Sequence, residues 1–146
     1  MNIYTIGFTR KGAEEFFGTL RSAGIKNVID IRLQNTSQLA GFTKKEDLPY
    51  FLAEILAADY LHEPLLAPEE TAFKAYRVGE LDWKGLRRAY MKLAADRSME
   101  TVIDWKKVLK RRSVLLCSEP RAEHCHRQLL VEYLQKKGLD LDQIDL

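Results

Sequence analysis

The sequence predicts an α/β fold: a mainly parallel sheet flanked by helices, in three layers as in Rossmann-like folds, forming a single domain over residues 1–146. Two observations carry this prediction. Short β-rich runs alternate with segments of helical periodicity, and residues 113–117 form an almost unbroken apolar run, which is typical of a central strand in a parallel sheet. A composition with 46% hydrophobic and 30% charged residues is that of a globular protein.

The N-terminal residues predict a β-α-β unit. Residues 2–6 have the pattern of a strand that ends at Gly7, and residues 27–32 have that of a second strand with an apolar centre. Between them the apolar residues recur at helical spacing, at Ala13, Phe16, Phe17, Leu20 and Ala23. A crossover of this kind is right-handed and makes its two strands parallel.

The next segment predicts a loop, a helix and a short strand. Residues 33–43 are polar and lack a clear period, so we expect a loop there. Residues 44–58 regain helical periodicity, and Thr43 is a candidate N-cap with Glu46 completing a capping box. Residues 60–62 are a candidate third strand.

Residues 69–110 predict a helical insertion in two or three pieces, broken near Gly79 and around residues 96–98. The stretch 74–112 holds twelve lysines and arginines against five acidic residues, although the net charge of the whole chain is only +2. Four aromatic residues are interleaved with these charges, namely Tyr76, Trp83, Tyr90 and Trp105. Such a set can bind nucleic acid by phosphate neutralisation and base stacking, or it can be a solvated helix face above a core.

The C-terminal segment predicts a strand, a helix and a last short strand. Pro120 stands at a good first helical position after the strand 113–117, with Ser118 or Glu119 as cap. The predicted helix runs to Gly138, and residues 139–146 can supply the last strand.

Membrane proteins and disulfide-rich secreted proteins do not fit this sequence. No apolar run approaches the roughly 18 residues that span a bilayer, and the N-terminus lacks the pattern of a signal peptide. Two cysteines make no disulfide framework, which suits a reducing compartment. We therefore expect a cytoplasmic protein with no membrane partner.

Residues that can carry chemistry follow three of the predicted strands. Ligand crevices of open parallel sheets lie beyond the carboxyl ends of the strands. Those ends carry Gly7, the pair Asp30 and Arg32, and the pair Cys117 and Glu119. We expect these side chains to meet at one edge of the sheet.

The segment from Cys117 to Arg127 is the most informative. At about 100° per residue, the apolar residues of the following helix centre on the direction of His126, so His126 is predicted to point inward with Cys125 and Arg127 on either side. A helix N-terminus adds partial positive charge, which favours a thiolate or a bound phosphate. These residues can supply a nucleophile, a general acid or base, and an anion clamp.

Three interpretations of this segment stay open. The first is structural, with a buried cysteine, a core histidine bonded to a carbonyl and a surface arginine. The second is catalysis by a thiolate with acid-base help. The third is a zinc site, although the paired short spacings of zinc modules are missing; its candidate ligands are Cys117, Cys125, His126 and His62 or His124. The phosphatase signature is excluded, because Glu123 stands where its arginine belongs.

Two further features have competing interpretations. Asp30 and Arg32 are either a structural ion pair at the sheet edge or an orienting carboxylate beside an anion-binding guanidinium. Gly7 allows close backbone approach, but no glycine-rich phosphate fingerprint follows it, which disfavours dinucleotide binding.

In these residues the chain resembles the domain-of-unknown-function 488 family. The resemblance rests on Thr5-Ile6-Gly7-Phe8-Thr9, Asp30-Ile31-Arg32 with Ser37, Phe42, Cys117-x-Glu119 and Cys125-His126-Arg127. Family members usually carry His-Ser in place of Phe8-Thr9 and often Pro in place of Asn35. The resemblance implies an α/β fold with these positions forming one site, and it implies no reaction.

We therefore expect an enzyme that acts on a phosphate-bearing substrate, such as a nucleotide or nucleic acid. The expected catalytic residues are Cys117, Glu119, Cys125, His126 and Asp30. The expected anion-binding residues are Arg32, Arg127, Gly7, Thr9 and Ser37. No metal ligand or cofactor is assigned. The alternatives are a non-catalytic module that binds nucleic acid or another partner, and a metal-binding domain.

Overall fold

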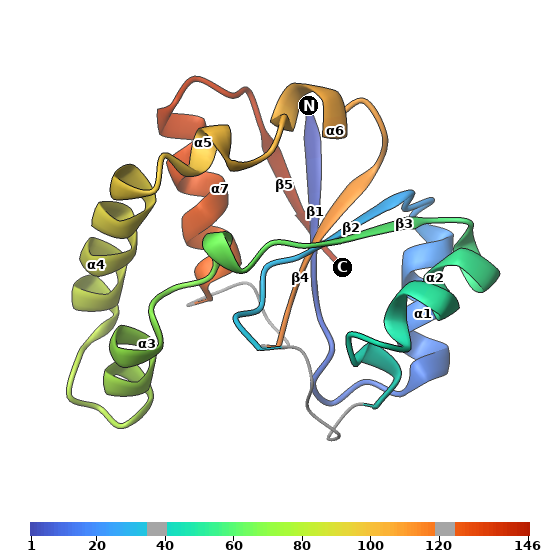
Figure 1. The fold of residues 1–146 in the computed structure, drawn as a ribbon, viewed down its shortest axis with the longest axis horizontal. Helices are drawn as coiled ribbons and strands as arrows, with labels where there is room; N and C mark the ends of the chain where they lie inside the picture. The colour runs from blue at the N-terminus through green and yellow to red at the C-terminus, as the bar shows by residue number, and fades with distance from the viewer. Residues whose placement is uncertain (35–40, 119–124) are drawn as a thin grey trace.

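The chain folds around one five-stranded sheet whose strands are all parallel, in the order β3-β2-β4-β1-β5 (Figure 1). The computed structural model describes residues 1–34, 41–118 and 125–146. The strands are β1 (Asn2–Gly7), β2 (Asn27–Asp30), β3 (Asp59–His62), β4 (Ser113–Cys117) and β5 (Asp142–Asp145). The predicted α/β class with a mainly parallel sheet is confirmed.

Seven α-helices of the described residues flank this sheet in two layers. They are α1 (Ala13–Ser22), α2 (Leu48–Leu56), α3 (Glu70–Arg77), α4 (Trp83–Asp96), α5 (Met99–Val102), α6 (Trp105–Val108) and α7 (His126–Lys136), with short 3-10 turns η1 (Gly41–Thr43) and η2 (Pro64–Leu66). Figure 1 shows α1 and α2 on one face and α4, α5 and α7 on the other. One buried cluster lies beneath each layer.

The connections explain these layers. The crossovers from β1 to β2 and from β2 to β3 run in the same direction along the sheet, and their helices share one face. The crossovers from β3 to β4 and from β4 to β5 run in the opposite direction, so right-handedness places their helices on the other face. The chain therefore leaves the neighbouring strands β2 and β4 in opposite directions, which is the arrangement that opens a ligand crevice at the carboxyl ends.

Alternation along β4 decides which way its last side chain points. Val114 and Leu116 belong to the cluster beneath α1 and α2, whereas Leu115 and Cys117 belong to the cluster beneath α4 and α7. Cys117 thus ends β4 on the face that α7 covers. The same cluster contains Cys125, the residue that precedes α7.

Two predicted helix starts were wrong. The helix expected over residues 44–58 begins at Leu48, because Pro49 is tolerated only in a first helical turn, and Asp47 rather than Thr43 is its N-cap. The last long helix begins at His126 and not at Pro120, since Cys125 has an extended backbone with φ −121° and ψ 150°.

The second strand ends at Asp30, two residues earlier than expected, so Arg32 lies beyond it. The basic insertion contains four helices, α3 to α6, rather than two or three. Its breaks were predicted correctly: Gly79 and Ser98 have positive φ angles of 81° and 49°. The predicted strands at residues 60–62 and near the C-terminus are confirmed.

Within the described part of the chain, none of the helices has the length and apolar character needed to cross a lipid bilayer.

Candidate functional site

Two cysteines and an arginine meet where β4 ends and α7 begins. Gly7 pairs with Cys117 and Asp30 with Leu116, so the ends of β1, β4 and β2 are neighbours at one edge of the sheet. The Sγ atoms of Cys117 and Cys125 lie 3.0 Å apart. Nη1 of Arg127 donates a hydrogen bond to Sγ of Cys117 at 3.2 Å, and all three side chains are buried.

The imidazole of His126 extends this cluster and is buried, as its predicted inward direction required. Its Nε2 donates to the carbonyl oxygen of Ile31 at 3.1 Å, because a carbonyl can only accept. Nδ1 is therefore the acceptor nitrogen, and it lies 3.8 Å from Sγ of Cys125. Burial lowers the pKa of His126 to about 4, so the ring is neutral near pH 7.

Charge is distributed unequally between the two sulfur atoms. The hydrogen bond to Cys117 and then burial raise the pKa of the Cys125 thiol, so Cys125 keeps its proton. The guanidinium of Arg127 donates to Cys117, and such a charged donor favours a thiolate. Arg127 thus favours a thiolate at Cys117 while burial opposes it, and Cys117 is placed to accept the S–H of Cys125.

Lys11 places a second positive charge near this pair. It follows β1 by four residues and is half-buried. Burial lowers the pKa of its ammonium; Glu15 opposes this shift, and Arg127 and Cys117 act on the ammonium as well. Lys11 is thus within electrostatic reach of Cys117, although the sequence analysis did not select it. The strand-end rule could have found it, because it belongs to the loop that follows β1.

The pair Asp30 and Arg32 is a buried ion pair with a closed set of partners. Nε and Nη2 of Arg32 donate to the two carboxylate oxygens of Asp30 at 2.8 and 2.7 Å. Nη1 and Nη2 also donate to Oγ1 and the carbonyl oxygen of Thr43 at 3.2 and 2.6 Å. The hydroxyl of Tyr60 donates to Asp30 at 2.6 Å. This geometry favours the structural interpretation of the pair, since most donors of Arg32 are engaged inside the chain.

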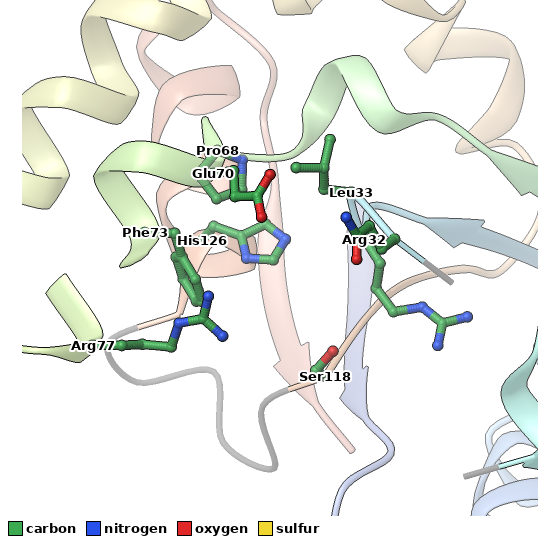
Figure 2. Close-up of a pocket in the computed structure, with 9 residues that line it drawn as sticks. Arg32, Leu33, Pro68, Glu70, Phe73, Arg77, Ser118 and His126 are labelled. Carbon is green, nitrogen blue, oxygen red and sulfur yellow. The ribbon is translucent and has the colours of Figure 1, made fainter. Parts of the chain in front are cut away.

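A cavity of about 200 Å³ lies beside the thiol cluster. Its wall contains the residues adjacent to both cysteines, Ser118 and His126, as well as the segment after β2 and one face of α3. The full lining is Arg32, Leu33, Gln34, Pro68, Glu70, Phe73, Arg77, Ser118 and His126. Figure 2 shows the guanidinium of Arg32 extending away from His126. The other arginine of the lining is Arg77, which belongs to α3.

Helix α3 forms the outer wall of this cavity. Glu70, Phe73 and Arg77 are spaced by three and four residues, which puts them on one side of the helix. The ring of Phe73 stands edge-on to His126 with centroids 6.1 Å apart, and the Arg77 guanidinium lies 5.1 Å from the Phe73 centroid (Figure 2). These three residues were missed by the sequence analysis, which treated the insertion as a basic surface.

The remaining predicted site residues have varied positions. Gly7 is buried at the end of β1, and Oγ1 of Thr9 donates to the carbonyl oxygen of Ser118 at 2.5 Å. The ring centroid of Phe8 lies 5.0 Å from the Arg32 guanidinium carbon. Glu119 and Ser37 lie outside the described residues, as do His124 and Pro120.

The described residues contain one group able to hold a metal ion, formed by Cys117, Cys125 and His126 with ligand atoms within 4.8 Å of one another. His62, considered as a fourth ligand, is not part of this group, and its Nε2 is instead 2.8 Å from the carbonyl oxygen of Arg32. A His that donates its other ring N–H to a carbonyl is typical of metal ligands. However, the Arg127 guanidinium beside Cys117 opposes a cation there.

The basic insertion does not present one continuous surface. Tyr90 and Trp105 are core residues, and their polar atoms donate to the carbonyl oxygens of Leu66 and Met99. Arg111 and Arg112 precede β4, so they lie at the amino edge of the sheet, opposite the thiol cluster. Of the four interleaved aromatics, only Tyr76 and Trp83 are partly accessible, with their rings 6.0 Å apart.

The fold and the site together define a class: an α/β protein with a parallel sheet and a thiol, imidazole and guanidinium cluster at the carboxyl edge of its central strand. Residues 12–134 match the family described as Domain of unknown function DUF488. The match covers most of the chain, so this protein belongs to that family. No curated protein and no solved structure matches the chain.

Proposed function

We propose that this protein is an enzyme that uses the thiolate of Cys117 as a nucleophile on a phosphate-bearing substrate, such as a nucleotide or nucleic acid. One observation carries the proposal: the Arg127 guanidinium donates to Cys117, while Cys125, 3.0 Å away, retains its proton. A thiolate rather than a thiol is the reactive form of cysteine. This pair lies beside a cavity at the point where the topology opens a crevice.

Cys125 and His126 handle the proton in this proposal. The three groups form a compact cluster, with 3.0 Å between the sulfur atoms and 3.8 Å between Sγ of Cys125 and Nδ1 of His126. Ile31 fixes the ring through Nε2, which leaves Nδ1 able to accept a proton. A proton that leaves or returns to the reacting group can therefore pass through these two contacts. Glu119, assigned to the same task from the sequence, stays a prediction.

Arg77 and Lys11 bind the phosphate in this proposal, whereas Arg32 holds Asp30 in place. Arg77 lines the cavity and is exposed, and Lys11 is electrostatically coupled to Cys117 and Arg127. Glu70 lies on the same wall as Arg77 and repels an anion. We therefore expect a weak site for free phosphate and a stronger one for a larger substrate that also contacts the Phe73 wall.

Turnover and binding test this proposal separately. Reduced full-length protein is incubated with a panel of nucleoside monophosphates, diphosphates and triphosphates, and the products are separated by chromatography. Cys117→Ser should abolish any turnover, and Arg77→Gln should weaken binding of AMP several-fold by calorimetry, whereas Arg88→Gln, at an exposed position on α4, should not. Full turnover by the Cys117→Ser protein would reject the proposal.

A second candidate is a non-catalytic nucleic-acid-binding module. The half-buried rings of Tyr76 and Trp83 favour it, together with the exposed Lys74 and Lys84 on the same two helices. In that case binding of single-stranded RNA should weaken steeply with salt and should not change in Cys117→Ser. The same variant therefore separates the two functions.

A further inference from the structure

The two sulfur atoms are nearly at bonding distance from one another. Sγ of Cys117 and Sγ of Cys125 are 3.0 Å apart, and a disulfide bond is about 2.0 Å long. Neither residue is in a disulfide bond, and they are the only two cysteines of the chain. A movement of about one ångström along the line between the sulfur atoms would bring them to the disulfide length.

We propose that Cys117 and Cys125 form an intramolecular disulfide when the protein meets a small hydroperoxide such as hydrogen peroxide. The geometry provides both roles that this chemistry needs. Arg127 favours the attacking thiolate at Cys117, and Cys125 is the neighbouring protonated thiol that resolves the product.

The reaction balances with hydrogen peroxide as the only oxidant. The Cys117 thiolate attacks one oxygen, the O–O bond breaks, and the products are a sulfenic acid and hydroxide, which takes up a proton to form water. Sγ of Cys125 then attacks the sulfur of Cys117, its proton leaves with the displaced hydroxyl group, and a second water forms. Two thiols are oxidised by two electrons in total, and one peroxide is reduced to two waters.

Burial of both cysteines restricts which oxidant can react. Neither sulfur is exposed to solvent in the described structure, so a small oxidant reaches the two sulfur atoms more readily than a bulky reagent does. Hydrogen peroxide is small and uncharged, and the adjacent cavity is bounded by Ser118 and His126, the neighbours of the two cysteines. We therefore expect reaction with hydrogen peroxide and slow reaction with an aromatic disulfide reagent.

The disulfide would also regulate the proposed enzyme, and this part rests on the proposed function. Oxidation removes the Cys117 nucleophile and replaces the charged partner of Arg127 with a neutral sulfur. The oxidised protein should then be inactive until a dithiol reduces it. The chemistry of the sulfur atoms itself needs no substrate to be observed.

The same cluster is a weaker candidate for zinc. Two thiolates bound to one zinc ion at about 2.3 Å each in tetrahedral geometry lie about 3.8 Å apart, farther than the distance found here. Only three candidate ligands are present among the described residues, and Arg127 adds a positive charge beside one of them. Zinc bound to these sulfur atoms would prevent disulfide formation, so one experiment can distinguish zinc binding from disulfide formation.

The test uses reduced full-length protein, with its zinc content measured by elemental analysis before a graded hydrogen peroxide treatment. Intact mass under denaturing conditions should show the loss of two hydrogen atoms and of both free thiols, reversed by dithiothreitol. In Cys125→Ser the reaction should stop at a sulfenic acid at Cys117, trapped by dimedone, and Cys117→Ser should react far more slowly. Circular dichroism checks that both variants are folded.

The outcomes separate this inference from the proposed function. Over-oxidation of Cys117 without a disulfide, or one zinc ion per chain that prevents the reaction, would overturn the inference. A disulfide in a protein whose turnover does not depend on Cys117 would leave the inference standing and reject the enzyme proposal. Turnover that depends on Cys117 in a protein that forms no disulfide would support the enzyme proposal and reject the disulfide inference.

Discussion

Arg127 donates a hydrogen bond from Nη1 to the sulfur of Cys117 at 3.2 Å, and this contact joins the start of α7 to the end of β4. A guanidinium is always protonated near neutral pH, so it is a permanent positive partner for that sulfur. Both side chains are buried, where low polarity strengthens the attraction. The contact therefore links the stability of the strand-to-helix junction to the charge state of the thiol.

The first prediction concerns the loss of this guanidinium. Arg127→Met should move the thiolate titration of the protein, followed by ultraviolet absorbance, upward by about one pH unit or more, because an opposite charge within reach stabilises the anion. Arg88→Met, at an exposed position on α4, should leave the titration unchanged. An unchanged titration in Arg127→Met would mean that Cys117 is an ordinary thiol.

The second prediction concerns the buried pair formed by Asp30 and Arg32. Asp30→Asn should lower the free energy of unfolding in urea by about 3–5 kcal/mol, because it leaves a buried guanidinium without its anionic partner. Tyr60→Phe removes only the hydroxyl that donates to Asp30 and should cost about 1–2 kcal/mol.

The same pair separates a structural role from anion binding. Folded Arg32→Lys protein should be less stable than the wild type but should bind AMP with nearly unchanged affinity, because the Arg32 guanidinium is bound by Asp30 and Thr43 and extends away from His126 (Figure 2). If Arg32→Lys lost as much AMP affinity as Arg77→Gln, Arg32 would have to be counted among the anion-binding residues.

Much of the location of the site could be predicted from the sequence. The apolar run of β4 marked a central strand, and the rule for strand ends then brought Asp30 and Cys117 to one edge of the sheet. Apolar periodicity in α7 correctly predicted that His126 points inward. These features depend on local patterns, so one chain was enough to find them.

Other features depend on contacts between distant segments, and local patterns do not contain them. The structural interpretation placed Arg127 at the surface, whereas its side chain is buried and donates to Cys117. Helix α3 was treated as part of a basic surface, although its side chains close the cavity. The start of α7 was misplaced because Pro120 is a common helix-start signal, whereas the extended backbone of Cys125 determines the actual start.

The third prediction concerns stability at mildly acidic pH. The folded-state pKa of His126, about 4, lies below the usual value of 6.5, so the unfolded chain binds a proton in a range where the folded chain does not. Stability should therefore fall as pH decreases from about 6.5 to about 4, by an amount on the order of 3 kcal/mol.

The free energy of unfolding in urea, measured between pH 7 and pH 5, reports the contribution of His126, because most carboxyl groups titrate at lower pH. His126→Gln should show a flatter pH dependence than the wild type. Nuclear magnetic resonance of the wild-type ring gives an independent measurement, in which the His126 ring should remain neutral at about pH 5.5. A ring that is protonated at that pH contradicts the buried, carbonyl-bonded tautomer.

The fourth prediction concerns the two opposite charges that α3 presents to the cavity. Glu70→Gln should tighten the binding of inorganic phosphate a few-fold, because it removes a like charge from the cavity wall, and Arg77→Gln should weaken it by a similar factor. Both residues are exposed, so neither change should alter the free energy of unfolding by more than about 0.5 kcal/mol. Calorimetry at low and high salt gives both affinities, and the two effects should shrink together as salt screens the charges. Opposite changes in affinity without a change in stability identify this cavity as the place where the anion binds, whereas no response to either variant would move the anion site away from α3.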